Sequence, residues 1–424
     1  MKKVFCLLLA CSLLAVILTG CGQSSKPADS TQAETVAETK APETDAAETE
    51  AVADTEAAPE ETTAAETAAE TTAAAPAASS GPKTLNVYNW GEYISDGSED
   101  SYDTVKEFEK WYKETYGQSV KVNYDTYASN EDMYSKLSSG AVSYDVVIPS
   151  DYMIARMVSE DMLLPLNFDN IPEYENIDES FRNLYYDPEN LYSVPYAYGI
   201  VGIIWNANEV DEADATGWDL MWNDKYAGKI VQFNNSRDAF GTAMYKLGLD
   251  VNSDDKAVWD QALEELKAQR NVVYSYVMDE IFNIMESGEA AVGAYYAGDY
   301  FTMLDAQAPN VDLRFYYPDP TNYYIDAMCI PTCCQDQELA EIFINFMLSR
   351  DAAVANAEYT YYASPNRTVF TDPEYLEDLG EETIAILYPE TEDFAQQYNT
   401  YAYKNLSQEL LDYVNTLWEN VKIN

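Results

Sequence analysis

The chain has 424 residues with 74 acidic side chains, 24 basic ones and no histidine, which gives a formal net charge of −50. This excess of acid argues against nucleic acid and anionic lipid as ligands and is compatible with a cationic one, although solubility outside the cell would explain most of it. The absence of histidine removes Ser-His-Asp and Cys-His nucleophiles and histidine-bound zinc, so that among enzymes a carboxylate-dependent hydrolase is the alternative that remains.

Residues 1–21 are predicted to form a lipoprotein signal peptide. Lys2 and Lys3 precede an apolar run, Val4 to Leu18, which is shorter than the roughly 20 residues that a membrane-spanning helix needs. The run leads into Leu18-Thr19-Gly20-Cys21, which resembles the bacterial lipobox, whose cysteine is acylated. We therefore expect an extracytoplasmic protein held to the outer face of the cytoplasmic membrane, as in Gram-positive bacteria, through lipid on Cys21 alone.

Residues 22–82 are predicted to be a disordered acidic linker. The stretch is rich in Ala, Thr and Glu and contains no aromatic residue, Leu, Ile or Met. Such a composition cannot bury enough apolar surface to offset the entropy lost on ordering. We interpret it as a spacer between the membrane and the folded part.

The first folded segment alternates between strand and helix patterns. Strands are predicted at 84–88, 119–124 and 144–148, and helices at 102–116 and 130–138. The first of these helices places Val105, Phe108 and Tyr112 on one face. This order predicts a doubly wound α/β sheet with ligands bound at the carboxyl ends of its strands.

The rest of the chain continues the same alternation. We expect a strand pair over 194–205, a further strand at 290–296, and helices near 237–247, 254–269, 339–348 and 406–421. Residues 83–424 are enough for two lobes of ordinary domain size.

Neither a metal nor a cofactor is predicted. After signal cleavage and acylation of Cys21, only Cys329, Cys333 and Cys334 remain, with no fourth soft ligand at zinc-like spacing. These cysteines are expected to form a local disulfide or to be buried thiols. No glycine-rich loop of the phosphate-binding type opens a predicted helix.

Aromatic residues and carboxylates occur together where strands are expected to end. The segments are Tyr88–Ile94, Pro149–Tyr152, Tyr296–Tyr300 and Tyr323–Asp326. Aromatic walls pack on methylene groups and attract cations, and carboxylates accept charged hydrogen bonds, so the combination suits an aliphatic chain that carries ammonium groups. The alternative is that these are ordinary core or rim aromatics.

From Thr84 to about Val421 the chain resembles the spermidine/putrescine-binding proteins of bacterial ABC transporters. The resemblance rests on the order and spacing of several segments, among them Tyr88–Tyr93, Tyr144–Tyr152, Val194–Gly199, Asn235–Asp238, Asp326–Pro331 and Ser364–Asn366. It implies a two-lobed fold of the type II periplasmic-binding-protein kind, in which each lobe is a doubly wound sheet and a hinge closes an interlobe cleft on the ligand. Lobe 1 would comprise 83–198 with about 326–370, and lobe 2 would comprise 199–325 with about 371–424.

The same resemblance implies the ligand-binding residues, position by position. They are Trp90, Gly91, Glu92, Tyr93, Ser150, Tyr152, Asn235, Asp238, Tyr296, Asp299, Tyr324, Asp326 and Tyr362. Asn235 stands where spermidine-type members have aspartate, and tyrosine replaces a frequent tryptophan at 296 and 324. These departures leave the exact amine open, and Asp299 favours a diamine.

The implied protein is a monomeric, non-enzymatic solute-binding lipoprotein that captures a polyamine, putrescine or spermidine. Its partners would be the permease and ATPase of an ABC importer. A binding protein for another small cationic solute or an amino acid is the alternative within the same class, and a surface carboxylate-dependent hydrolase is the alternative from another class.

Overall fold

The computed structural model describes residues 81–389 and 391–423. The predicted signal peptide, Cys21 and all of the predicted linker except its last two residues lie outside the described residues. Within the described ranges, no helix is both long and apolar enough to span a bilayer.

The strands of the described chain form one mixed sheet. Its order is β2-β1-β3-β9-β4-β7-β5-β6, and β8 pairs with β4. The bounds are β1 Lys83–Trp90, β2 Val120–Tyr127, β3 Val146–Val147, β4 Ser193–Asn206, β5 Ile230–Phe233, β6 Val273–Val277, β7 Val292–Tyr296, β8 Leu313–Tyr316 and β9 Tyr323–Cys329. Parallel pairs at either end, β1 with β2 and β3, and β5 with β6 and β7, agree with the predicted alternation, whereas β4, β8 and β9 are antiparallel to their partners.

Strand β4 joins the two halves of this sheet. Its residues Ser193 to Ile200 pair with β9, and its residues from Val201 onward pair with β7 and β8. The prediction of a strand pair over 194–205 is therefore wrong, because this segment is one continuous strand. The glycines in this strand allow close contact with its neighbour, since a Cβ on Gly202 would lie 2.1 Å from Cζ of Phe315.

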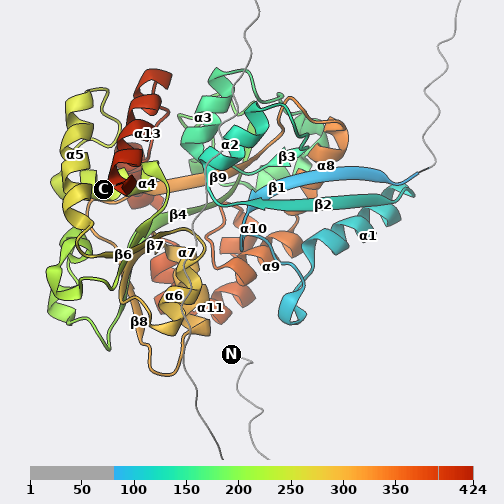
Figure 1. Cartoon of the computed structure of the whole chain (residues 1–424). Helices are drawn as coiled ribbons and strands as arrows, with labels where there is room; N and C mark the ends of the chain where they lie inside the picture. The colour runs from blue at the N-terminus through green and yellow to red at the C-terminus, as the bar shows by residue number, and fades with distance from the viewer. Residues whose placement is uncertain (1–80, 390, 424) are drawn as a thin grey trace, which may run out of the picture. The chain divides into compact units, whose positions relative to one another are not determined.

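Helices cover both halves of the sheet. Their bounds are α1 Thr104–Tyr116, α2 Asn130–Ser138, α3 Asp151–Ser159, α4 Ser236–Leu247, α5 Lys256–Gln269, α6 Ile281–Ser287, α7 Ala297–Ala306, α8 Gln337–Met347, α9 Arg350–Thr360, α10 Arg367–Phe370, α11 Pro373–Leu387, α12 Thr391–Tyr401 and α13 Gln408–Ile423. Helices α1, α2 and α3 contact β2 and β9, whereas α4, α6 and α7 contact β5 and β7. Figure 1 shows the first group around β1 and β2 and shows α5 and α13 on the far side of β4 and β9. We call the β1 side the first lobe and the β5 side the second lobe.

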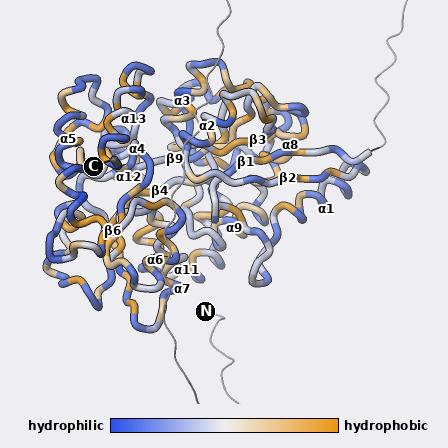
Figure 2. The backbone as a smooth tube through the Cα atoms, in the orientation of Figure 1, coloured by the Kyte–Doolittle hydropathy of each residue, from blue (hydrophilic) through white to orange (hydrophobic). Residues whose placement is uncertain are grey.

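The predicted helices agree with the structure to within about two residues, which is the usual uncertainty of helix ends. In α1, Phe108 and Tyr112 are buried and Val105 is half-buried, as the periodicity predicted. Asp103 caps its first turn by accepting a hydrogen bond from the Lys106 amide at 2.9 Å. Hydrophobic and hydrophilic residues alternate along α1 in Figure 2, which is typical of a helix with one buried face.

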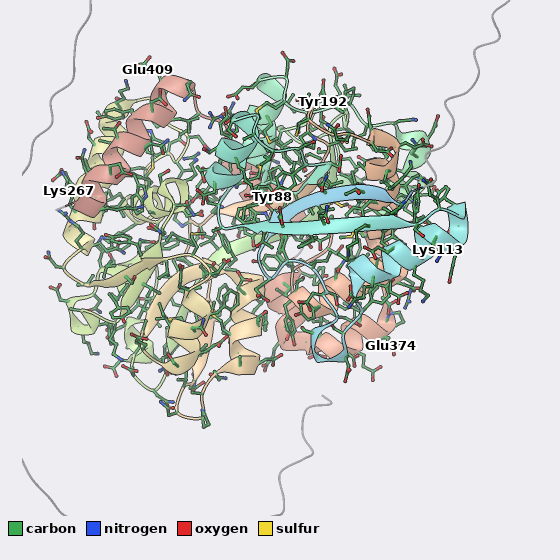
Figure 3. The ribbon with its side chains drawn as sticks, turned by 45° about the vertical axis from the view of Figure 1, so that its right-hand side comes forward. Tyr88, Lys113, Tyr192, Lys267, Glu374 and Glu409 are labelled. Atoms are coloured by element: carbon green, nitrogen blue, oxygen red, sulfur yellow. The ribbon has the colours of Figure 1, made fainter. Side chains whose placement is uncertain are left out.

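Charged residues away from the sheet face the solvent. Figure 3 shows Glu374 of α11 and Glu409 of α13 at the periphery, and both are exposed.

The cysteines of the described chain are free thiols, with Cys329 buried and Cys333 and Cys334 half-buried. Of the two alternatives left open by the sequence, the structure has thiols rather than a disulfide.

Replacing Gly202 with alanine tests the close contact inside β4. The new Cβ would also lie 2.8 Å from the backbone oxygen of Tyr316, so the strands must move apart. We expect Gly202→Ala to lower the free energy of unfolding by about 1–3 kcal/mol, the usual cost of overpacking. Urea unfolding measures this, with Gly81→Ala as the control because nothing lies within 4 Å of its Cβ. Equal unfolding midpoints for the two variants would contradict the assignment.

Candidate functional site

A cavity between the two lobes collects nearly all of the predicted site residues. It has a volume of about 740 Å³, including its mouth, which is open to solvent. The predicted residues that line it are Trp90, Gly91, Tyr93, Ser150, Tyr152, Asn235, Asp238, Tyr296, Asp299, Tyr324, Asp326 and Tyr362. They come from the ends of β1, β3 and β7, from the starts of α3, α4 and α7, from β9, and, in the case of Tyr362, from the segment after α9.

Glu92 is the one predicted residue that does not line the cavity. It follows β1 with a positive φ of 49°, and it is exposed. Its negative charge nevertheless contributes to raising the pKa of Asp279 and of Asp299. Glu92 therefore adds to the negative electrostatic potential near Asp279 and Asp299, although it does not line the cavity.

Aromatic rings form much of the wall. The indole Nε1 of Trp90 donates to the backbone oxygen of Ile148 at 2.9 Å, which fixes the ring. The ring of Tyr93 meets that of Tyr362 edge-on, with centroids 4.5 Å apart. On the second-lobe side, Tyr296 and Tyr324 also meet edge-on, at 5.4 Å. These contacts hold the rings as a preformed wall.

Asp326 lies on the buried floor of the cavity. It is inside β9, not after a strand as the sequence predicted, and Tyr324 is in the same strand. Its Oδ2 accepts a hydrogen bond from the Tyr93 hydroxyl at 2.7 Å, whereas Oδ1 accepts none of good geometry from the described residues. Burial is the main cause that raises the pKa of Asp326, to about 6, and the nearby Ser150 hydroxyl opposes the shift.

A second carboxylate, Asp299, also lines the cavity. Asp299, in the first turn of α7, accepts a hydrogen bond from the Tyr362 hydroxyl at 2.9 Å. Burial raises the pKa of Asp299 to about 8, and the charge of Asp279 adds to the shift. Asp279 also lines the cavity. It is exposed overall, and partial desolvation, with the charges of Glu280 and Glu92, raises its pKa.

A third carboxylate, Asp238, lies in the first turn of α4. Its Oδ2 accepts hydrogen bonds from Asn235 Nδ2 at 2.7 Å and from the Tyr296 hydroxyl at 2.8 Å. Asn235 is also the N-cap of α4, since its Oδ1 accepts from the Asp238 amide at 2.8 Å. Burial again raises the pKa of Asp238. Asn235 thus orients this carboxylate, in the place where an aspartate would add a charge.

Several lining residues were not predicted. They are Ala128, Ser129, Asn130, Glu131, Asp151, Met278, Asp279, Phe282, Tyr295, Asn322 and Tyr403. Asp151 stood inside a segment that the sequence singled out, and Asn130 and Glu131 begin a predicted helix that follows a strand. Tyr295 lies inside a predicted strand, and Ala128 and Ser129 lie between a predicted strand and helix, but none of them was singled out. Met278, Asp279, Phe282, Asn322 and Tyr403 lie outside the segments that the sequence singled out.

The charged side chains in the described lining of the cavity are all acidic. Among the described residues, those lining the cavity include six carboxylates, Glu131, Asp151, Asp238, Asp279, Asp299 and Asp326, and no lysine or arginine. Burial raises the pKa of Asp151 to about 7. In the described chain, no group of three or more His, Cys, Asp or Glu side chains has the arrangement of a metal site. The arrangement is suited to organic cations, whose charge would offset the desolvated carboxylates.

Comparisons with known proteins agree with this geometry. The family model for bacterial extracellular solute-binding proteins matches residues 103–380. A spermidine/putrescine-binding periplasmic protein of Salmonella typhimurium is 32% identical over 326 residues, which are 76% of this chain and 87% of that protein.

Two solved structures are also similar. A putative spermidine/putrescine ABC transporter from Listeria monocytogenes is 31% identical, with a TM-score of 0.71 over 80% of this chain and 99% of that one. The spermidine/putrescine substrate-binding protein PotD of Streptococcus pneumoniae is 33% identical, with a TM-score of 0.63 over 80% and 99% of the two chains. Relatives of this kind have the two-lobed fold that the sequence predicted. The chain therefore belongs to the family of bacterial extracellular solute-binding proteins and is a relative of the spermidine/putrescine-binding proteins.

Proposed function

We propose that the cavity binds a polyamine, putrescine or spermidine, and that the protein delivers it to the permease and ATPase of an ABC importer. The observation that carries this proposal is the set of six carboxylates in an aromatic-walled cavity whose described lining has no basic side chain. A linear polyamine supplies the matching chemistry, because its methylenes pack on the rings and its ammonium groups donate to the carboxylates. The names of the relatives support the same class of ligand.

Within this proposal Asp326 and Asp299 are ammonium ligands. The methylene chain of the amine packs on the rings of Trp90, Tyr93, Tyr296, Tyr324 and Tyr362. The lobe boundaries implied by the resemblance, 83–198 with about 326–370 and 199–325 with about 371–424, belong to the same proposal, as does closure of the lobes around a hinge. We further propose that the protein acts as a monomer and has no catalytic activity.

Two other functions compete with polyamine capture. One is capture of a different small cation or an amino acid, and the other is hydrolysis by a pair of the cavity carboxylates. A melting-temperature screen separates the first, because a ligand that binds only the folded state raises the melting temperature. Putrescine and spermidine should raise it, arginine should do so less, and adipate, a dianion similar in length to putrescine, should not. Hydrolysis of a glycoside panel by the purified protein would support the second.

Removing single carboxylates tests the ligand assignment. We expect Asp326→Asn or Asp299→Asn to weaken polyamine binding by roughly 2–4 kcal/mol, the range for leaving a buried charge without its partner. Titration calorimetry with putrescine and spermidine measures this, after melting curves have confirmed the fold. Asp254→Asn is the matched control, because this carboxylate is exposed and should change binding by less than about 1 kcal/mol. Wild-type affinity in both site variants would rule out these two residues as the ammonium ligands.

Binding should also depend on pH. The pKa values of about 6 for Asp326, 7 for Asp151 and 8 for Asp299 exceed the ordinary value of 3.8, so the folded protein holds more protons than the unfolded chain between about pH 4 and 8. Without ligand, its stability should fall as pH rises through that window. An ammonium ligand favours the ionised carboxylates, so binding should release protons, and affinity should fall at least about tenfold from pH 8 to pH 5.5.

Calorimetry at pH 6.5 in two buffers of different ionisation enthalpy measures the proton release directly. Glu131, Asp238 and Asp279 also have pKa values raised mainly by burial and should contribute to it. An affinity that does not change between pH 5.5 and 8 would show that the carboxylates are already ionised before the ligand binds.

We also propose that Cys21 carries the lipid that holds the protein to the membrane. The proposal rests on the spacing of Leu18-Thr19-Gly20-Cys21 after the apolar run. Cys21→Ala should give a protein that is not acylated and that is found in the medium or as uncleaved precursor. Fractionation and mass spectrometry of the N-terminal peptide measure this. An unmodified Cys21 in wild-type protein from the soluble extracellular fraction would refute the anchor.

A further inference from the structure

Two carboxylates from opposite lobes face the same end of the cavity. Glu131 is in the first turn of α2, which contacts β2, and Asp238 is in the first turn of α4, which contacts β5. Both line the cavity. Both also lie where the helix dipole favours an anion, so each is suited to stay ionised when a cation is nearby.

Neither carboxylate has a cationic partner among the residues that the structure describes. Glu131 Oε1 accepts a hydrogen bond from the Tyr152 hydroxyl at 3.0 Å, and Asp238 Oδ2 accepts from Asn235 and Tyr296, all of which are neutral donors. In the described part of the chain, neither acid forms an ion pair with a lysine or arginine. The negative charge of Asp238 contributes to the raised pKa of Glu131.

Arg237, which precedes Asp238 in the chain, is held by other groups. Arg237 donates from Nη1 to the Val251 oxygen at 2.8 Å and from Nη2 to Asn252 Oδ1 at 2.9 Å. Its guanidinium also lies 4.4 Å from the centroid of the Tyr403 ring. Its charge lowers the pKa of both acids, but burial is the larger cause and raises them. The arginine therefore moderates the negative charge at this end and does not neutralise it.

Two residues of the cavity lining have a buried polar atom without a partner. Asp326 and Tyr324 line the cavity, and Asp326 Oδ1 and the Tyr324 hydroxyl have no hydrogen-bond partner of good geometry among the described residues. A buried polar atom without a partner is costly, so both residues retain capacity to bond to a polar ligand.

We infer that Glu131 and Asp238 bind the same ammonium group from the two sides of the cleft, and that this shared ammonium holds the lobes closed. The inference rests on the proposed function and assigns a new residue, Glu131, to the binding of charge. An ammonium has three donors, so it can bond to both carboxylates at once. Without it, two like charges in a desolvated space oppose closure. The ligand's charge is thus a condition of closure as well as a source of affinity.

A simpler role for Glu131 is to position Tyr152. Asn130 Nδ2 donates to the Tyr152 hydroxyl at 3.1 Å and to Ser150 Oγ at 3.0 Å, so Tyr152 belongs to a fixed network even without Glu131. Tyr152→Phe removes the hydroxyl that Glu131 accepts from and leaves the carboxylate in place. This variant therefore separates the two roles.

The test is a double-mutant cycle measured by titration calorimetry with putrescine and spermidine. We expect Glu131→Gln and Asp238→Asn each to raise Kd at least about tenfold. The Kd of the double variant should be no more than about threefold higher than that of the weaker-binding single variant. The Kd of Glu131→Asp should lie between those of the wild type and Glu131→Gln. Tyr152→Phe should raise Kd less than Glu131→Gln does, because it removes one neutral hydroxyl and keeps the carboxylate. Asp132→Asn is the matched control, since it removes an exposed carboxylate from the same turn of α2 and should leave Kd within about twofold.

Small-angle X-ray scattering gives a second readout that a positioning role would not change. Addition of saturating putrescine should reduce the radius of gyration of the wild type and of Asp132→Asn, and should reduce that of Glu131→Gln less. Additive effects of the two carboxylate substitutions would overturn the shared ammonium, and equal Kd values for Glu131→Gln and Tyr152→Phe would reduce Glu131 to a positioning residue. A wild-type chain that binds neither amine would overturn the proposed function itself, and this inference with it.

Discussion

Desolvated negative charge, with no lysine or arginine in the described lining, is the constraint on which this cavity depends. Taking a carboxylate out of water costs several kcal/mol unless a cation and hydrogen bonds replace the lost hydration. Here burial raises the pKa of every lining carboxylate for which the direction is resolved, and the described lining contains no lysine or arginine. Such a cavity is less stable alone than with a cation inside it. A bound cation therefore replaces hydration that the acids have lost, and this replacement contributes to the binding free energy.

The sheet topology brings these acids together. Strand β4 runs through both lobes, and β9 lies antiparallel to its first half, so Asp326 is presented from the centre of the sheet. Asp238 and Asp299 come from the second lobe, each in the first turn of a helix that follows a strand. Because carboxylates reach the cavity from a central strand and from both lobes, a rotation of one lobe against the other changes the distances between them. The geometry of the charges and the closure of the lobes are thus coupled.

Several helices and strands could be predicted because each is defined by a hydrophobic pattern within its own residues. The amphipathic spacing of Phe108 and Tyr112 defines α1, and the buried strand and following helix place Ser150 and Tyr152 at the cavity. The strand over 194–205 was misread, because its glycines allow contact with Phe315 and Tyr324 from distant segments, which no local pattern reveals. Asp326 was predicted to follow a strand for the same reason, since β9 gains its strand character from pairing with β4. Asp279 and Tyr403 reach the cavity only through the tertiary fold, and neither was predicted.

Tyrosine hydroxyls are the common partners of the cavity acids. Tyr93 donates to Asp326, Tyr362 to Asp299, Tyr296 to Asp238 and Tyr152 to Glu131. A neutral donor orients a carboxylate and leaves its charge available, whereas a lysine or arginine in the same place would form an ion pair that the ligand must displace. The resemblance to the spermidine/putrescine-binding proteins implies a frequent tryptophan at position 296. Tyrosine stacks more weakly there, but its hydroxyl bonds to Asp238, and an indole nitrogen at another place on a larger ring does not reproduce that bond. The aromatic wall and the charged floor are in this way one structure, because the same rings that pack on an aliphatic chain also fix the acids that bind its ends.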